Sequence, residues 1–251
     1  MLLLNKAVIV TGGANGIGYE CVKAYLKEGA RVAVLDRQAI SHLSEETKDQ
    51  CLELVCDVSN DGQVASAIKE VANHFGKIDA MHNNAGIANP SKMLHDTTIT
   101  EWQNLMSINV LSIYLTTKYA LPHLQSTKGC ILNTSSMVGE IGQNQHAAYA
   151  ATKGAVNALT KSMAIDYANY GIRVNAVAPA GVWTPTLKQW ASEQPNAEGI
   201  EKYLDDIHLL GYCPQGDVVA DACVYLLSDK ARFITGCILP VSGGAELGYR
   251  R

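Results

Sequence analysis

A tyrosine and a lysine stand four positions apart at Tyr149 and Lys153. On a helix this spacing places both side chains on one face, so a phenol and an ammonium can approach the same point. A free tyrosine has a pKa near ~10, and a fixed positive neighbour favours its phenolate form and makes it a usable base near neutral pH. A hydroxyl held by Ser136 could then lose its proton to Tyr149. Oxidation of the carbon would further require an acceptor for the hydride.

A glycine-rich turn near the N-terminus could hold that acceptor. Gly12, Gly16 and Gly18 follow an apolar run and open a helical pattern, with Asn15 and Ile17 between them. Residues without a Cβ let a pyrophosphate approach backbone N–H groups at a helix start, where the helix dipole favours negative charge. We therefore expect these five residues to bind a dinucleotide. The alternative is an ordinary glycine turn of an α/β protein.

Asp36, at the end of the next apolar run, bears on which dinucleotide binds. A carboxylate there accepts hydrogen bonds from the ribose hydroxyls and repels a 2′-phosphate, which favours NAD over NADP. Arg37 is the opposing observation, because a guanidinium can bind that phosphate. No basic residue occurs within the glycine turn to help it. We expect NAD as the cofactor and Arg37 as a solvated side chain.

Composition indicates one α/β domain over residues 1–251, since 47% of the residues are hydrophobic and 18% are charged. The net charge of −4 comes without a basic run, which argues against nucleic acid and against a polyanionic substrate. We expect a small neutral hydroxylated substrate instead. No stretch approaches the ~18 apolar residues of a membrane span, so we expect no membrane association and a cytoplasmic location.

Seven cysteines are scattered along the chain, with no CxxC pair and no histidine at ligand spacing. This pattern predicts neither a metal site nor a disulfide framework. We expect buried thiols in a reducing compartment. The cysteines are Cys21, Cys51, Cys56, Cys130, Cys213, Cys223 and Cys237.

Short β-branched runs alternate with longer helical patterns, which predicts a Rossmann-type, doubly wound fold: a seven-stranded parallel sheet with helices on both faces. The expected strands are Ala7–Val10, Arg31–Leu35, Leu52–Cys56, Ala80–Asn83, Cys130–Asn133, Arg173–Ala176 and Cys237–Val241. The expected helices are Gly16–Glu28, Ser41–Lys48, Gln63–Phe75, Thr100–Leu124, Ala147–Tyr170 and Asp217–Leu227. The stretch 185–213 fits this alternation poorly, and we expect it to form a substrate lid at the carboxyl edge of the sheet.

These motifs, in this order, resemble the short-chain dehydrogenase/reductase family over essentially the whole chain. The resemblance implies that Tyr149 is the catalytic acid or base and that Ser136, thirteen positions earlier, binds the reacting oxygen. It implies that Lys153 holds the nicotinamide ribose and lowers the pKa of Tyr149, and that Asn109 supports a water chain. One departure from the family pattern is Ala180 after Pro179, which would be strained if its φ were positive.

The same resemblance implies the remaining cofactor contacts. The adenine would lie against Asp57 and Val58, Asn83 would lie near the cofactor, and Val182 and Thr184 would bind the carboxamide. Tyr149 and Lys153 belong to the cofactor site as well as to catalysis. Further contacts would come from Asn84, Ala85, Gly86 and Pro179.

A narrower resemblance, to the type-fourteen 17β-hydroxysteroid dehydrogenase and L-fucose dehydrogenase group, rests on Val182-Trp183-Thr184-Pro185 and on the tail Gly243–Tyr249. It implies oxidation of L-fucose or a related aldose to its lactone. Amide and indole groups near the expected base suit a neutral sugar. The candidate substrate residues are Gln143, His146, Trp183 and Trp190.

Three alternatives stay open. A 17β-hydroxysteroid or another apolar secondary alcohol could be the substrate, a 3-oxoacyl reductase could share the motifs, and a dinucleotide sensor could keep the fold without chemistry. The small residues of the helix at Ala147–Tyr170, together with the family resemblance, predict a homotetramer built on this helix and on Thr100–Leu124.

Overall fold

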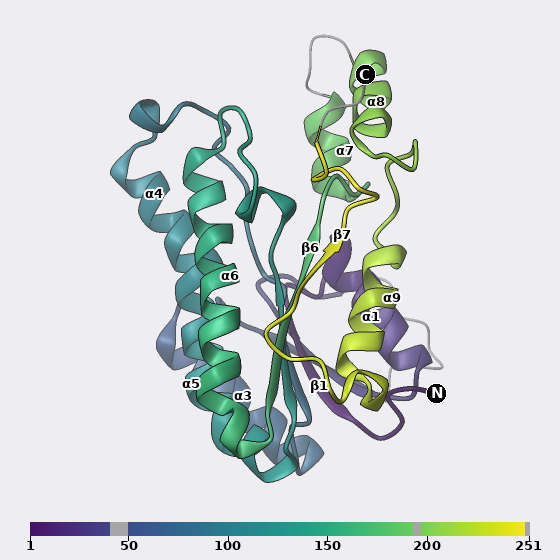
Figure 1. Cartoon of the computed structure of the whole chain (residues 1–251). Helices are drawn as coiled ribbons and strands as arrows, with labels where there is room; N and C mark the ends of the chain where they lie inside the picture. Colours follow the sequence, from purple (N-terminus) through teal and green to yellow (C-terminus); the bar gives the residue numbers. More distant parts are fainter. Residues whose placement is uncertain (41–49, 193–196, 249–251) are drawn as a thin grey trace.

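Seven parallel strands form the centre of the protein, in a computed structural model that describes residues 1–40, 50–192 and 197–248. The sheet order is β3-β2-β1-β4-β5-β6-β7. The chain therefore runs from β1 to one edge, returns to β4 beside β1, and continues to the other edge (Figure 1). This confirms the predicted doubly wound sheet. The strands are β1 (Ala7–Thr11), β2 (Arg31–Asp36), β3 (Cys51–Val55), β4 (Ala80–Asn83), β5 (Cys130–Thr134), β6 (Arg173–Pro179) and β7 (Ile238–Val241).

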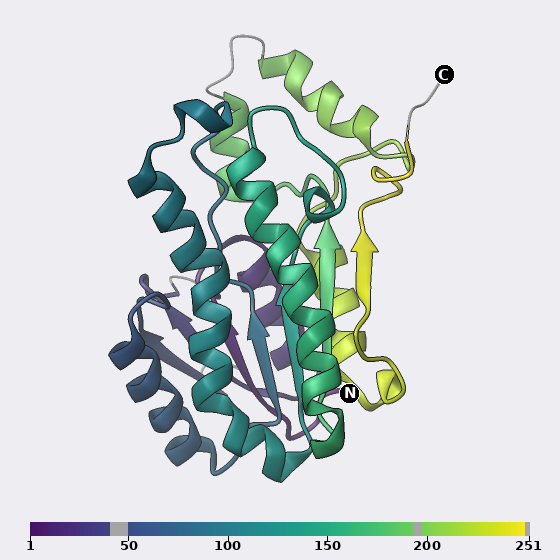
Figure 2. The ribbon, with the colours of Figure 1, turned by 60° about the vertical axis from the view of Figure 1, so that its left-hand side comes forward.

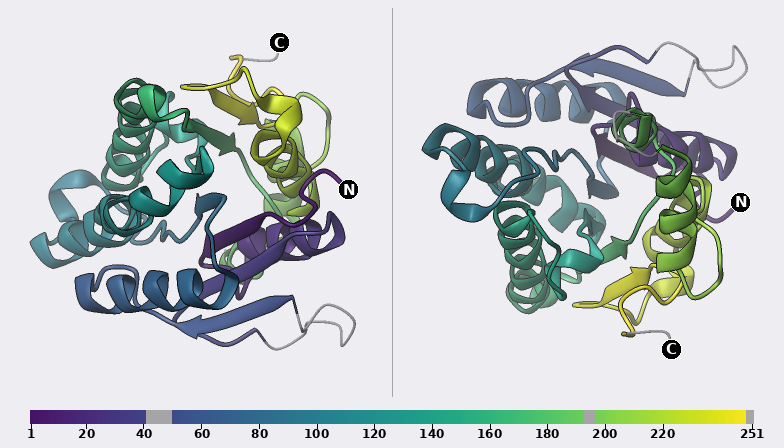
Figure 3. Two further views of the ribbon diagram at one scale, coloured as in Figure 1. Left: turned by 90° about the horizontal axis from the view of Figure 1, so that it is seen from below. Right: turned by 90° about the horizontal axis from the view of Figure 1, so that it is seen from above.

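Helices cover both faces of this sheet, as Figure 3 shows in views from below and from above. One face carries α1 (Gly16–Lys27) and α9 (Asp217–Leu227), and the other carries α3 (Asp61–Phe75), α5 (Ser112–Thr127) and α6 (Ala147–Tyr167). Successive side chains of a strand point to opposite faces. Val8 and Val10 accordingly enter the core under α1 and α9, whereas Ala7 and Ile9 enter the other core. No helix of the described residues could cross a membrane.

The helix predicted at Thr100–Leu124 has three parts. These are α4 (Ile99–Met106), a π-helical segment at Ser107–Leu111, and α5. A π turn inserts one residue and so rotates the following side chains around the helix, which a continuous apolar pattern does not reveal. Asn109 lies in this segment. The helix predicted at Ala147–Tyr170 is α6 followed by a 3₁₀ turn at Ala168–Tyr170.

The expected lid, residues 185–213, contains two helices beyond the carboxyl ends of the strands (Figure 2). They are α7 (Pro185–Ser192) and α8 (Ala197–Ile207). The helix expected at Ser41–Lys48 lies outside the described residues. The remaining short turns are Leu94–Asp96, Met137–Gly139 and Asp229–Ala231.

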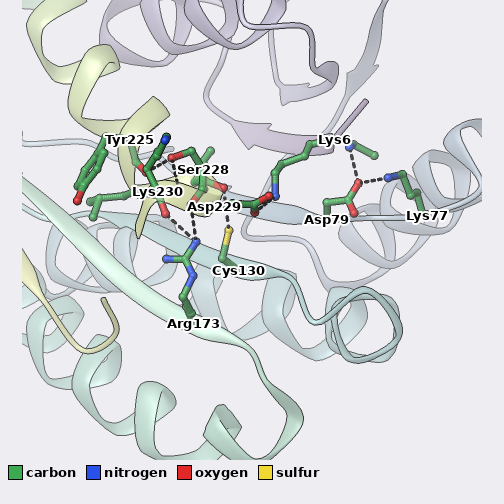
Figure 4. A network of polar contacts seen from close by, with 12 residues as sticks. Lys6, Lys77, Asp79, Cys130, Arg173, Tyr225, Ser228, Asp229 and Lys230 are labelled. Atoms are coloured by element: carbon green, nitrogen blue, oxygen red, sulfur yellow. Dashed lines mark hydrogen bonds and ion pairs between the residues drawn. The ribbon is translucent and has the colours of Figure 1, made fainter. Parts of the chain in front are cut away.

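A polar network closes the opposite, amino-terminal end of the sheet (Figure 4). Arg173, the first residue of β6, donates to the Leu226 carbonyl at 2.9 Å and the Ser228 carbonyl at 3.4 Å, where α9 ends. A cation is favourable at the C-terminus of a helix, because the last carbonyls lack intrahelical donors. Lys6 pairs with Asp229 at 2.8 Å. These contacts fix α9 on the sheet at the end far from the predicted site.

Candidate functional site

The glycine turn packs directly against the segment that follows β4. Gly12 and Gly16 have φ angles of +65° and +56°, which favour glycine. A Cβ on Gly12 would lie 2.8 Å from the Ala85 Cα, and one on Gly18 would lie 2.1 Å from the Gly12 carbonyl oxygen. Both positions therefore require glycine for close packing as well as for any ligand.

Asn84 and Thr11 hold this packing together. The Asn84 side-chain amide donates to the carbonyls of Thr11 at 3.1 Å and Gly12 at 3.0 Å. The Thr11 hydroxyl in turn accepts from the backbone N–H groups of Asn84 and Ala85, each at 3.0 Å. This role of Thr11 was not predicted from the sequence, where its place at the end of β1, directly before the first glycine, is the only signal.

The residues at the start of α1 fit a phosphate group. Asn15 caps the helix by accepting from the Gly16 N–H at 2.8 Å. A Cβ on Gly16 would lie 3.4 Å from the Thr184 methyl group, so Thr184 closes one side of the turn. A pocket of about 90 Å³ is lined here by Asn15, Gly16, Trp183 and other residues. A helix N-terminus with a glycine cradle is the arrangement that binds the pyrophosphate of a dinucleotide.

Asp36 lies beside the turn, at the carboxyl end of β2. One carboxylate oxygen accepts from the Ala14 N–H and the other from the Gln38 N–H, each at 3.0 Å. Asp57 follows β3, and hydrogen bonds from the hydroxyl and N–H of Ser59 lower the pKa of its carboxyl group. Both carboxylates thus stand at the edge where the turn opens.

Ser136, Tyr149 and Lys153 come together beyond the carboxyl end of β5. Helix α6 places the Lys153 Nζ 5.7 Å from the centroid of the Tyr149 ring. Lys153 also donates to the Thr134 carbonyl at 2.7 Å. The neighbouring Ser135 is bound elsewhere, because its hydroxyl donates to Asn157 at 2.5 Å.

The pKa shifts at this site follow from burial. Burial raises the pKa of Tyr149 to about 12, although a hydrogen bond with Ser136 lowers it in part. Burial also lowers the pKa of Lys153 to about 8, because a charged ammonium is poorly solvated there. The charge of Lys153 is not among the causes of the Tyr149 shift in the ligand-free chain, so a lowering of that pKa by Lys153 stays a prediction for the form with a nucleotide bound. Desolvation outweighs the Ser136 hydrogen bond, and Tyr149 is protonated at neutral pH in the ligand-free chain.

Asn109 joins the loop after β4 to the helix that carries Tyr149. Its side chain accepts from the Ile87 N–H at 2.8 Å and donates to the Ile87 carbonyl at 2.8 Å and to Thr152 at 3.0 Å. The Thr152 hydroxyl then donates to the Tyr149 carbonyl at 2.7 Å. A Cβ on Gly86 would lie 3.4 Å from the Asn109 amide oxygen and 3.6 Å from the Lys153 Nζ. Gly86 thus stands between these two side chains.

The Asn83 side chain, expected to lie near the cofactor, is hydrogen-bonded within the protein on the side of the sheet away from the glycine turn. It belongs to a buried chain of side-chain hydrogen bonds, which we call the amide ladder. Thr116 donates to Asn83 at 2.6 Å, Asn83 donates to Asn133 at 2.9 Å, and Asn133 donates to Thr160 at 2.9 Å. Alternation along the chain explains the difference, because Asn83 points towards α5 and α6 while Asn84 points towards the turn.

The residues after β6 bear on two expectations, a ligand contact at Val182 and backbone strain at Ala180. The side chain of Val182 is buried in the core under α9, so a ligand could reach only its backbone. Ala180 does not have a positive φ, and the strain considered for it does not arise. Pro179 ends β6, and its carbonyl lies 3.3 Å from the Ser136 hydroxyl oxygen. Val58 is buried.

The four candidate substrate residues have different neighbours. The ring of His146 meets that of Tyr149 edge to face, with centroids 6.2 Å apart. Gln143 is exposed in the preceding turn, where Gln145 has a φ of +58°. Trp183 lines the pocket at Asn15, and its backbone N–H donates to the Pro214 carbonyl at 2.8 Å. Trp190 is half-buried on α7. Trp183 therefore lies along the glycine turn.

Comparison with known proteins decides the family. A family model described as "Enoyl-(Acyl carrier protein) reductase" matches residues 12–246. L-fucose dehydrogenase of Bos taurus is 40% identical over 247 residues, which cover 98% of this chain and 91% of the bovine protein. The chain belongs to the short-chain dehydrogenase/reductase family. It is therefore an oxidoreductase of a family that binds a nicotinamide dinucleotide.

Solved structures agree with this short-chain dehydrogenase/reductase assignment. The aldohexose dehydrogenase of Thermoplasma acidophilum is 31% identical with a TM-score of 0.92, and the match covers 99% of this chain and 97% of that protein. The 3-ketoacyl-(acyl-carrier-protein) reductase of Brucella melitensis was solved in complex with NADH. It is 30% identical with a TM-score of 0.88, and the match covers 97% of this chain and 99% of that protein. ElxO was solved with NADP bound. It is 32% identical with a TM-score of 0.91, and the match covers 98% of this chain and 100% of that protein. Similar structures thus hold either nucleotide.

Proposed function

We propose that this short-chain dehydrogenase/reductase oxidises L-fucose, or a closely related aldose, at the anomeric carbon to a lactone with NAD. The observation that carries the proposal is the 40% identity with bovine L-fucose dehydrogenase across 98% of the chain. The structural likeness to an aldohexose dehydrogenase supports the same substrate class. Substrate identity depends on a few pocket side chains, so the sugar itself needs a direct test.

In the proposed reaction, Ser136 binds the hydroxyl oxygen of the substrate and Tyr149 takes its proton. NAD, when bound, supplies the acceptor for the hydride. Lys153 holds the nicotinamide ribose and favours the phenolate in its charged form, while Asn109 positions the helix of Tyr149 through Thr152. Only the phenolate form of Tyr149 can take this proton, and a hemiacetal hydroxyl gives it up more readily than a simple alcohol because it is more acidic.

Asp36 supports NAD as the nucleotide. Its carboxylate stands at the edge of the glycine turn, within 3.0 Å of the Ala14 N–H, where a 2′-phosphate would meet a negative charge. The residues proposed to hold NAD share the carboxyl edge of the sheet. They are Gly12, Asn15, Gly16, Ile17, Gly18, Asp36, Asp57, Val58, Asn84, Ala85, Gly86, Tyr149, Lys153, Pro179, Val182 and Thr184.

One observation favours a second candidate, a 17β-hydroxysteroid or another apolar secondary alcohol. The expected lid exposes apolar side chains that a sugar would not need. Tyr203, Leu209, Leu210 and Tyr212 are 57%, 42%, 71% and 53% exposed. An exposed apolar group of this kind is suited to a hydrophobic ligand or to a partner surface.

The test is the rate of NADH formation with L-fucose, D-arabinose, L-galactose and oestradiol at matched concentrations. Turnover of one or more sugars supports the proposal, and the Tyr149→Phe variant is the control for a catalysed rate. Turnover of oestradiol alone would transfer the function to the second candidate. NAD binding without turnover of any alcohol would indicate a dinucleotide sensor.

A further inference from the structure

Two cysteines and a histidine, far apart in the sequence, meet in the core between the sheet and helices α1 and α9. Cys21 lies on α1, His82 on β4 and Cys223 on α9. One donor atom from each lies within 4.8 Å of the other two. All three residues are 0% exposed. We call them the thiol–imidazole cluster; in the described part of the chain it is the one such group of three possible metal ligands.

His82 is unusual for its place in the sheet. The side chains of Val8, Val10 and Leu132 on the same face are apolar and belong to the core under α1 and α9. A buried imidazole needs partners, and His82 has two. Its Nδ1 lies 2.9 Å from the Tyr25 hydroxyl and its Nε2 lies 3.0 Å from the Thr134 hydroxyl. The ring orientation is therefore fixed from outside the cluster.

We propose that the thiol–imidazole cluster binds one zinc ion. Two thiolates and an imidazole are ligands that zinc prefers in proteins. The two thiolate charges balance those of Zn²⁺, so the bound ion would bring no net charge into the apolar core. Binding displaces the two thiol protons to solvent. Zinc–sulfur bonds of ~2.3 Å separate tetrahedral donors by roughly 3.8 Å, so the present donors need to close by at most about 1 Å.

The surroundings of the cluster fit this role. His82 would ligate through Nδ1, the nitrogen on the Tyr25 side, while Nε2–H donates to Thr134. Such an outer hydrogen bond commonly fixes the tautomer of a metal-binding histidine. Ligation through Nδ1 would break the present hydrogen bond with the Tyr25 hydroxyl, and that hydroxyl could then take the fourth position as a neutral ligand.

Such a site would be structural and separate from the proposed oxidation. A zinc ion would join α1, α9 and β4 behind the glycine turn. The sequence pattern could not reveal it, because its three ligands lie on three elements with no local spacing in common. The alternation of β4, which turns His82 towards α1 and α9, creates the site.

The test uses the full chain without a polyhistidine tag, refolded with excess Zn²⁺ and dialysed. We expect about one zinc per chain by elemental mass spectrometry, and a higher thermal midpoint than for the protein refolded with a chelator. Refolding with Co²⁺ should give the thiolate-to-metal charge-transfer absorption of a tetrahedral sulfur site. Cys21→Ser and Cys223→Ser should each lose the bound metal and the absorption.

The matched control is the double variant Cys51→Ser, Cys237→Ser, which removes two half-buried thiols outside the cluster. It should keep the full metal content. If Cys21→Ser or Cys223→Ser does not fold, the cobalt spectrum of the wild type still decides. Wild-type protein that retains no zinc and gives no charge-transfer band would overturn the proposal. So would zinc that persists in both cluster variants.

Discussion

The carboxylate of Asp36 has two contacts within the protein besides its proposed place beside a nucleotide, since it accepts from Ala14 and Gln38. We expect Asp36→Ala to reduce the preference for NAD over NADP by about 10- to 100-fold, or ~1–3 kcal/mol, because both the repulsion and a charged hydrogen bond are lost. The measurement is kcat/KM with each nucleotide.

Asp36→Asn is the control, because an amide can still accept from the Ala14 N–H but carries no charge. If it keeps the wild-type preference, the effect comes from the shape of the turn and not from charge. Equal wild-type efficiencies with NAD and NADP would contradict the assignment of Asp36.

The lowered pKa of Lys153 should make the free energy of unfolding depend on pH. Its pKa is about 8 in the folded, ligand-free chain, below the ordinary value of 10.5. Between these values the unfolded chain holds a proton that the folded chain lacks, so the free energy of unfolding rises with pH in this interval. The rise should reach at most ~1.4 kcal/mol per pH unit. It should fade above about 10, where the raised pKa of Tyr149 acts in the opposite direction.

Urea unfolding at pH values between 7 and 10 checks this expectation. Lys153→Met should show a smaller rise than the wild type; a part remains because the Cys21 pKa is also lowered, to about 6. Lys161→Met, which removes an exposed lysine on the same helix, should keep it. Identical pH profiles for the wild type and Lys153→Met would show that Lys153 keeps its ordinary pKa.

At this scale the sequence predicts which side chains meet but not their charge states. Tyr149 and Lys153 are neighbours because helix geometry fixes the spacing of residues four apart. The direction of the Tyr149 shift depends on how much water burial removes, which no spacing reports. Likewise, adjacent Asn83 and Asn84 have similar surroundings in the sequence, and only the strand alternation separates their roles.

The start of α1 depends on glycine at position 18. In Gly18→Ala the new methyl group would lie 2.1 Å from the Gly12 carbonyl oxygen and 2.4 Å from the Asn84 amide nitrogen. We expect NAD binding to weaken at least ~10-fold and stability to fall by ~1–3 kcal/mol, as for overpacking of a tight contact. Calorimetric titration with NAD and thermal unfolding would measure both changes.

Gly142→Ala is the matched control, because nothing lies within 4 Å of a Cβ at that position and no positive φ is involved. It should bind NAD as the wild type does. Unchanged NAD affinity in Gly18→Ala would contradict the packing described for the turn.

Arg173 should stabilise the attachment of α9 to the sheet. Arg173→Met keeps much of the aliphatic stem but removes the hydrogen bonds to Leu226 and Ser228. We expect a loss of ~1.5–3 kcal/mol in the free energy of unfolding, with unchanged kcat because the residue lies at the far end of the sheet. Denaturant unfolding checks this, with the exposed Arg232→Met as control. A loss of turnover with unchanged stability would contradict it.

The elements themselves are largely predictable, and the exceptions have physical causes. All seven strands appear close to their expected positions, because buried parallel strands are short apolar runs. The π-helical segment at Ser107–Leu111 is not predictable, since its apolar residues fit a continuous helix equally well. That segment places Asn109 on the Ile87 loop, a contact that the sequence pattern does not predict.

At the scale of the whole molecule, α6 has an outer face suited to assembly. Ala151, Ala158 and Ile165 recur every seven residues and are all exposed, with Ile165 77% exposed. Small residues allow close helix approach. In support of the proposed homotetramer, Ile165→Lys should yield smaller species in light scattering at micromolar concentration. Val55→Lys, at an exposed site on β3, is the control and should leave assembly unchanged. A wild type that is monomeric would contradict the proposal.

The amide ladder has a consequence for how the strands find their alignment. Asn83 is paired with Asn133 across β4 and β5, and Met81 with Ile131. A shift by two residues would keep every side chain on its own face and exchange one apolar neighbour for another at little cost. The same shift would set an amide against Met81 or Ile131 and leave its polar atoms unsatisfied, at ~1–3 kcal/mol each. These few amides therefore make the misaligned pairing of β4 and β5 less stable than the native one. The apolar residues around them contribute little to this difference, because their neighbours are apolar in either alignment.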